Sequence, residues 1–344
     1  MKKGIATAIL ALGLLLICSA GASAQQPPLP EPGRNLSNNA EMWRGARQGI
    51  QGYVSIPNKQ AGVLVQSEGE NWRNLRNGPV STYGTWLLLG MVVVLALFFA
   101  LRGRIRVEAG PSPHRIKRFG AVERFSHWLT AVTFILLGLT GLNMLYGRYF
   151  LRPLIGADAF SALTAWGKYV HNFISFAFML GIVLLVLLWV RDNLPTRTDL
   201  KWLAMGGGLF GKGSHPPAHK FNAGQKLIFW GVVFFGTAIS ISGLLLMFPF
   251  SVADMHEMQL TQLGHSIVAL LFIAMIIAHI YIGTIGMEGA FDAMNSGMVD
   301  ENWAREHHNL WVAEMKGEKP PVDHDPQNPG PPSRAPAGGA TRPA

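Results

Sequence analysis

Five long apolar runs alternate with polar segments along the chain. Each run holds about 20 residues, the length that a helix needs to cross roughly 30 Å of hydrocarbon at 1.5 Å per residue. Asp, Glu, Lys and Arg are absent from the interior of every run. The pattern predicts an all-α membrane protein whose spans occupy residues 82–101, about 127–146, 169–190, 227–248 and 260–287.

The first residues have the pattern of a secretory signal peptide. Two lysines precede an apolar run, and the small-residue site Ala22-Ser23-Ala24 follows it. We therefore expect residues 1–24 to be removed, with an uncleaved anchor helix as the alternative. Residues 25–81 would then form an exported, loop-rich periplasmic segment, with short strands around Val54 and over 63–65.

The composition agrees with a membrane protein. Hydrophobic residues make up 49% of the chain and charged residues only 14%, whereas soluble domains are about a quarter charged. The single cysteine, Cys18, lies in the predicted signal peptide, so the mature chain would hold no disulfide, iron–sulfur cluster or covalently attached haem. Lys and Arg in loops beside spans explain the net charge of +9, and we expect no nucleic-acid binding.

Basic residues cluster in two of the segments between spans. Seven Lys and Arg lie within residues 102–124 and six within 191–226, whereas 251–259 has neither. The positive-inside tendency therefore places both basic segments in the cytoplasm and residues 25–81 in the periplasm of a bacterial inner membrane. Five spans put the C-terminus inside, and the Pro-, Gly- and Ala-rich tail over 313–344 is expected to be disordered.

Histidine is the only side chain in the spans whose usual pKa lies near neutral pH. Such groups are costly in a bilayer and indicate function. Four of the eleven histidines fall there, and the other seven, in loops and tails, are expected to be solvated. His265 and His279 are 14 residues apart in one run. In a helix this spacing gives a rise of about 21 Å and a rotation about 40° short of four full turns. The two side chains therefore lie on the same side of the helix at opposite depths of the membrane. The four are His127, His171, His265 and His279.

The predicted topology pairs these histidines. His127 and His279 would lie near the cytoplasmic face, and His171 and His265 near the periplasmic face. Two bis-imidazole sites at two depths are what two b-type haems require, and filled axial positions favour electron transfer over substrate activation. Zinc would want a further protein ligand, and a proton relay usually includes Asp or Glu; both remain alternatives.

Two small residues accompany this pattern. Gly138 and Gly141 lie 11 and 14 residues after His127, which places them within about 40° of its face on a helix. They could leave room for a flat macrocycle or permit ordinary close helix packing.

The stretch "KFNAGQK" stands at the entrance of the fourth span. Asn222, Gly224 and Gln225 would lie where backbone N–H groups are free and where amide side chains can hold a quinone carbonyl. Asn222 followed by Gln225 three residues later is also the pattern of a plain capping box. Both interpretations can hold, because a cap and a binding site use the same exposed donors.

Several stretches together resemble the cytochrome b (gamma) subunit of respiratory, membrane-bound formate dehydrogenase. They are "ERFSHWLTAVTFILLGLTGL", "KYVHNFISFAF", "KFNAGQK" and "WAREHHNLW", combined with His265 and His279. The resemblance covers about residues 115–312 and implies a four-helix di-haem bundle. The cytochromes of nickel-iron hydrogenase and of other molybdenum oxidoreductases share the histidine pattern and are the alternative. A histidine-containing transporter or an assembly anchor is the alternative of a different class.

The resemblance implies roles for individual residues. His127 and His279 would bind the cytoplasmic-side haem b, and His171 and His265 the periplasmic-side haem b. The residues implied to line a pocket for menaquinone or ubiquinone are Asn222, Gly224 and Gln225.

The resemblance also implies partners. The chain would be no enzyme by itself. It would take electrons from an iron–sulfur (beta) subunit served by a molybdenum or tungsten pterin (alpha) subunit. Residues 1–101 have no counterpart in that family. The span 82–101 would be an additional N-terminal helix, and residues 25–81 are expected to pack on the external partner subunits.

Overall fold

The computed structural model describes residues 51–53, 63–65, 69–208, 216–249 and 251–319. Five of the described helices are long and apolar enough to cross a membrane. The predicted all-α architecture of four spans plus one additional N-terminal span is confirmed. The predicted signal peptide and the stretch 320–344 of the predicted tail lie outside the described residues, as does most of the segment before residue 69.

The first span begins earlier than predicted. The helix α4 (Ser81–Arg102) continues backward through the π-helical turn η1 (Arg76–Val80) into α3 (Gly69–Leu75). Pro79 lies inside the turn, where a wider π-helical turn accommodates the missing backbone N–H. Residues 69–81, predicted as loop, are therefore helical. Before them, β1 (Gln51–Tyr53) pairs antiparallel with β2 (Val63–Val65).

The second and third spans form one long hairpin. The helix α5 (Ala121–Ile155) is separated from α6 (Ala157–Trp189) by Gly156 alone. Gly156 has φ 83°, a left-handed conformation that costs glycine little because it has no Cβ. Residues 147–168, which separate the second and third predicted spans, are therefore almost entirely helical, and the chain reverses at Gly156.

The fourth and fifth spans form a second antiparallel pair. The helix α8 (Ala223–Met247) begins after a capping box formed by Asn222 and Gln225. The helix α9 (Met255–Tyr281) begins after a similar box and ends in the π-helical turn η3 (Ile282–Gly286). Both histidines of the fifth span lie within α9.

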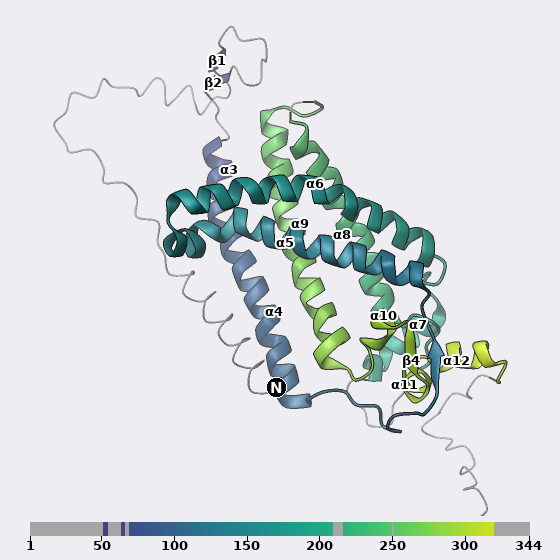
Figure 1. Cartoon of the computed structure of the whole chain (residues 1–344). Helices are drawn as coiled ribbons and strands as arrows, with labels where there is room; N and C mark the ends of the chain where they lie inside the picture. Colours follow the sequence, from purple (N-terminus) through teal and green to yellow (C-terminus); the bar gives the residue numbers. More distant parts are fainter. Residues whose placement is uncertain (1–50, 54–62, 66–68, 209–215, 250, 320–344) are drawn as a thin grey trace, which may run out of the picture.

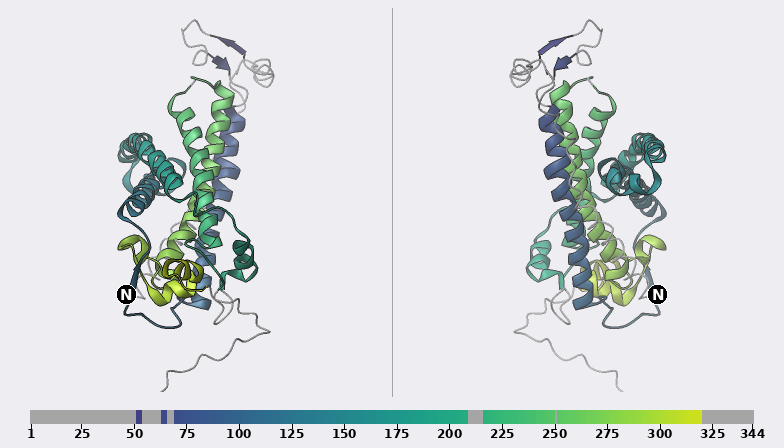
Figure 2. Two further views of the ribbon diagram at one scale, coloured as in Figure 1. Left: turned by 90° about the vertical axis from the view of Figure 1, so that its right-hand side faces the viewer. Right: turned by 90° about the vertical axis from the view of Figure 1, so that its left-hand side faces the viewer.

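The α5–α6 hairpin lies across the group formed by α4, α8 and α9 (Figures 1 and 2). Aromatic and aliphatic side chains of α5, α6 and α9 meet between them and form a buried cluster. The additional span α4 packs along α9. The first residue of α4 is also bonded to α5, because Tyr146 Oη of α5 donates to the carbonyl of Ser81 at 2.9 Å. The buried cluster consists of Phe134, Leu137, Phe178, Ile182 and Phe272.

A small cap closes one end of the bundle. It contains the antiparallel pair β3 (Arg115–Lys117) and β4 (Met298–Asp300). Beside it, α7 (Arg197–Ala204) and the 3-10 turn η2 (Gly206–Gly208) lie at the start of α8, where Lys226 Nζ donates to Asp199 Oδ2 at 2.8 Å. The helices of the cap are α10 (Asp292–Asn295), α11 (Glu301–His307) and α12 (Asn309–Lys316). Phe119, Trp189, Phe221, Val299 and Trp303 form its core. We call these elements the C-terminal cap.

The C-terminal cap corrects one prediction. The tail was expected to be disordered from residue 313, yet α12 continues to Lys316. Val312 and Ala313 are buried, and the Arg305 guanidinium holds both carboxylate oxygens of Glu318 at 2.9 and 3.0 Å. Burial of an apolar face and a two-point ion pair order this stretch.

Candidate functional site

The four span histidines meet as two pairs. The rings of His127 on α5 and His279 on α9 have centroids 6.2 Å apart and planes at 57°. The rings of His171 on α6 and His265 on α9 have centroids 6.3 Å apart and planes at 64°. The 14-residue spacing on α9 thus gives two facing pairs at two depths along one helix.

The ring separations fit one metal ion between each pair. A metal bound by an imidazole lies about 2.0 Å from the nitrogen, and the ring centre lies about 1.2 Å beyond it, so two ligating rings stand about 6.4 Å apart. Both observed distances agree with this value. No group of three or more His, Cys, Asp or Glu side chains suited to a metal ion occurs among the described residues, so the geometry favours a two-ligand centre.

Small residues border the His171–His265 pair. A Cβ added to Gly141 would lie 3.5 Å from Cε1 of His171, and one added to Gly243 would lie 3.5 Å from Cε1 of His265. A hollow of about 290 Å³ lies beside His265. The hollow beside His265, together with glycines next to both rings, fits the space that a flat macrocycle needs. Gly138 instead faces Ile273 of α9 at 3.9 Å, as in ordinary helix packing.

Hydroxyl groups fix the rings of this pair. Thr140 Oγ1 lies 2.8 Å from Nδ1 of His171, and Ser242 Oγ lies 2.9 Å from Nδ1 of His265. Around the other pair, Nδ1 of His127 is buried and has no hydrogen-bond partner. Sequence reasoning missed Thr140, Ser242 and Gly243; their one signal is a small or hydroxylated residue in a span.

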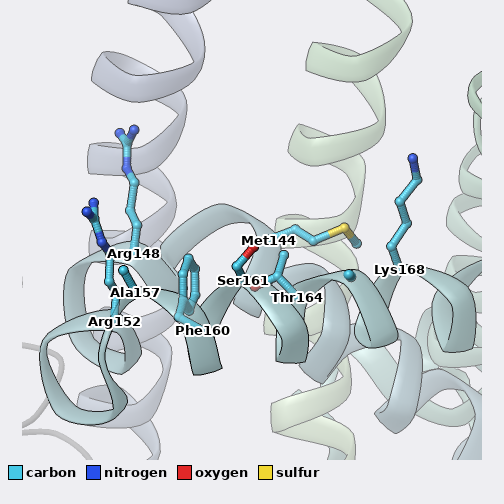
Figure 3. Close-up of a pocket in the computed structure, with 9 residues that line it drawn as sticks. Met144, Arg148, Arg152, Ala157, Phe160, Ser161, Thr164 and Lys168 are labelled. Carbon is cyan, nitrogen blue, oxygen red and sulfur yellow. The ribbon is translucent and has the colours of Figure 1, made fainter.

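A larger hollow of about 460 Å³ lies on the outer part of the α5–α6 hairpin (Figure 3). Arg148 and Arg152 rise on one side of it and Lys168 on the other. No histidine lines this hollow. It is therefore a basic surface feature of the hairpin, separate from both histidine pairs.

The residues Asn222, Gly224 and Gln225 lie together at the start of α8. The capping box is present: Asn222 Oδ1 accepts from the Gln225 N–H at 2.9 Å, and Gln225 Oε1 accepts from the Asn222 N–H at 3.2 Å. A Cβ on Gly224 would lie 3.0 Å from the Trp202 indole. The Trp202 indole of α7 therefore packs over the first turn of α8, where Gly224 has no side chain.

Arg118 adds a buried cation to this region. Its Nη2 donates to Gln225 Oε1 at 3.2 Å and to the carbonyl of Lys220 at 2.6 Å. Its guanidinium lies 5.2 Å from the ring centre of Trp303, a cation–π contact. Burial lowers the pKa of Arg118 to about 9. The sequence presents Arg118 only as one of many loop cations.

His308 corrects another prediction. The seven histidines outside the spans were expected to be solvated, yet His308 is fully buried. Its Nδ1 donates to the carbonyl of His219 at 2.8 Å. Burial, followed by the charge of Arg118, holds the pKa of His308 well below its usual value. An apolar neighbourhood of Trp303 and Trp311 explains the burial, and nothing in the local sequence predicts it.

Comparison with known families gives this geometry its context. The family model described as prokaryotic cytochrome b561 matches residues 118–298, more than half of the chain. The chain belongs to the prokaryotic cytochrome b561 family. The matched segment contains all four span histidines and both pairs. Members of this family carry haem b, so the chain is a multi-pass membrane cytochrome b with a role in electron transfer.

Individual relatives are more specific. The chain is 26% identical over 204 residues to the cytochrome b556(fdo) subunit of formate dehydrogenase from Escherichia coli strain K12, covering 58% of this chain and 93% of the relative. It is 25% identical to the nitrate-inducible cytochrome b556(Fdn) subunit of the same organism, covering 58% and 92%. The formate dehydrogenase cytochrome b556 subunit of Haemophilus influenzae is 23% identical, covering 58% and 83%.

Proposed function

We propose that this cytochrome is the membrane anchor and electron-transfer subunit of a formate dehydrogenase. It passes electrons from an iron–sulfur subunit through two b haems to membrane quinone. The observation that carries the proposal is the set of two facing histidine pairs, 6.2 and 6.3 Å apart, at two depths of α9. The formate dehydrogenase subunits among its relatives support the choice of electron source.

The histidine pairs would hold the haems in this proposal. His127 and His279 would hold one haem b, and His171 and His265 would hold the other. A bound haem b supplies a reversible one-electron couple. With two imidazoles at each centre, these residues would leave no free position for oxygen or peroxide, so electron transfer would be the function of the centre.

The distribution of charge supports an orientation. The basic segment that leads into α5 and the basic segment before α8 lie at the end of the bundle with the C-terminal cap, and we assign that end to the cytoplasm of a bacterial inner membrane. The His127–His279 pair is then the cytoplasmic one and the His171–His265 pair the periplasmic one. In this orientation α3 lies on the periplasmic side, where we propose that the iron–sulfur and pterin-bearing subunits dock.

The start of α8 is the proposed quinone site. Arg118 Nη2 and the Asn222 N–H are groups that only donate, and both lie at Gln225 Oε1. The amide oxygen of Gln225 must therefore face them, and its NH2 group must face away. None of the hydrogen bonds between described residues uses that NH2 group. It is available to donate to a carbonyl oxygen of menaquinone or ubiquinone.

Purification of the complex from its native membrane tests this function. Formate dehydrogenase subunits with molybdenum or tungsten pterin and iron–sulfur centres should accompany the chain, and formate should produce the difference spectrum of reduced low-spin b haem. Co-purification with hydrogenase subunits, or b haems that formate fails to reduce, would overturn the assignment to formate. A preparation that is folded and free of haem would overturn the cytochrome function altogether.

A further inference from the structure

The two histidine pairs differ in what their second ring nitrogens contact. Nδ1 of His171 and Nδ1 of His265 each face a hydroxyl, at 2.8 and 2.9 Å. Nδ1 of His127 is buried without a hydrogen-bond partner. Two chemically identical ligand sets therefore have different surroundings.

The hydroxyl protons are already used elsewhere. Thr140 Oγ1 donates to the carbonyl of Leu136 at 2.7 Å, and Ser242 Oγ donates to the carbonyl of Ala238 at 2.8 Å. A hydroxyl has one proton and two acceptor lone pairs. Each hydroxyl also has a second backbone carbonyl within reach, that of Leu137 at 3.1 Å for Thr140 and that of Ile239 at 3.3 Å for Ser242. With its proton in a backbone bond, each hydroxyl accepts from the histidine, and Nδ1 then carries the ring proton.

This arrangement fixes the tautomer of both rings. With the proton on Nδ1, the lone pair of neutral imidazole is on Nε2, the nitrogen left for a metal. Donation from Nδ1–H to an oxygen also makes the ring a stronger electron donor to the metal. A stronger donor stabilises ferric over ferrous iron and so lowers the reduction potential.

We propose that Thr140 and Ser242 are positioning residues that hold His171 and His265 as Nε2 ligands and set the haem between them at a lower reduction potential than the haem between His127 and His279. The inference rests on the haem assignment of the proposed function. A lower potential at the His171–His265 centre favours electron transfer toward the His127–His279 centre, which is the direction that the proposed function requires.

The chain offers matched controls for both hydroxyls. Thr133 lies two turns before Thr140 on α5, and its hydroxyl donates to the carbonyl of Leu129 at 2.7 Å without a histidine contact. Ser240 lies two residues before Ser242 on α8 and donates to the carbonyl of Gly236 at 2.6 Å. These residues make the same backbone bond, so they report the effect of losing such a bond alone.

Potentiometric titration of the purified complex is the test, with the periplasmic haem identified by the signal that His171→Ala removes. In Thr140→Val and Ser242→Ala its midpoint potential should rise. Up to a tenfold change in the one-electron equilibrium for each bond corresponds to about 59 mV. Thr140→Ser and Ser242→Thr should restore it, and Thr133→Val and Ser240→Ala should leave it unchanged.

Three outcomes would overturn the inference. In the first, the midpoint potential of the periplasmic haem stays unchanged in the double variant Thr140→Val/Ser242→Ala while both haems remain bound. In the second, the midpoint potential of the other haem changes instead. In the third, the Thr133→Val and Ser240→Ala controls change the midpoint potential of the periplasmic haem by the same amount. If Thr140→Val loses the haem, retention in Thr140→Ser still identifies the hydroxyl as the requirement, and loss in both contradicts it. Failure of His171→Ala to remove any haem would instead refute the haem assignment itself.

Discussion

The two ends of α9 present the same ligand in different settings. At the His265 end, the facing rings have hydroxyl partners and glycine neighbours. At the His279 end, the partner His127 has an unpaired buried nitrogen and an edge contact with Trp128 at 5.3 Å. That end also adjoins the C-terminal cap through Trp128, whose indole N–H donates to the carbonyl of Met294 at 2.9 Å.

If each pair holds a haem, as proposed, the difference between the two ends shows how the protein can distinguish its two centres. Both pairs have nearly equal ring separations, so the ligands alone give no direction to electron flow. Hydrogen bonds to the far side of the rings and the polarity around them are the remaining variables. The settings at the two ends differ in both respects.

Removing a ligand should separate the two centres most strongly. We expect each of the four single His→Ala variants to lose one of two haems, because one imidazole cannot complete the axial pair. His127→Ala and His279→Ala should lose the same low-spin signal, and His171→Ala and His265→Ala the other. Pyridine haemochrome analysis with electron paramagnetic resonance measures this. Different signals lost within one pair would break the comparison.

The quinone site should respond only at the His127–His279 end. Gln225→Glu keeps an acceptor for Arg118 and for the Asn222 N–H but removes the outward NH2 donor. We expect the KM for quinone to rise about tenfold, because one hydrogen bond of about 1.4 kcal/mol is lost. Both haem spectra and the rate of haem reduction by formate should stay unchanged. Unaltered quinone kinetics would return Gln225 to a capping role only.

Acid should loosen the C-terminal cap before it affects the bundle. The pKa of His308 is well below its usual value in the folded cap. The unfolded cap, with a pKa of about 6.5, therefore binds a proton first as the pH falls. Stability is complete above about pH 6.5 and declines below it, by at most about 1.4 kcal/mol per pH unit.

Hydrogen exchange of α11 and α12 measures this effect. Between about pH 7.5 and about pH 5.5, after correction for intrinsic rates, protection should fall in the wild type and much less in His308→Gln. The glutamine can donate to the His219 carbonyl and does not titrate. Equal losses in both proteins would remove His308 as the cause.

The sequence predicts those parts of the site that depend on local periodicity. The spacing of His265 and His279 places both on one side of a helix, and Asn222 with Gln225 predicts a cap, which the structure contains. Apolar runs also give the spans, although the ends of α5 and α6 extend well beyond them. The ends of these two helices that meet at Gly156 contain polar residues, so the apolar pattern does not reveal that they are helical.

The contacts that join distant segments could not be predicted. Thr140 meets His171 across 31 residues, and Ser242 meets His265 across 23, so only the packing of helices brings them together. From the sequence, Arg118 is one of the basic loop residues that orient the protein in the membrane, and His308 is one of the residues of a polar tail. Their burial depends on aromatic side chains that arrive from other elements of the cap.

The central claim is that electrons cross from the His171–His265 centre to the His127–His279 centre and then to quinone. Formate-driven reduction of the His279→Ala complex in the presence of quinone tests it most directly. We predict that the remaining haem becomes fully reduced by formate and stays reduced, because its outlet to quinone is gone. Reoxidation of that haem by quinone at the wild-type rate would contradict the account.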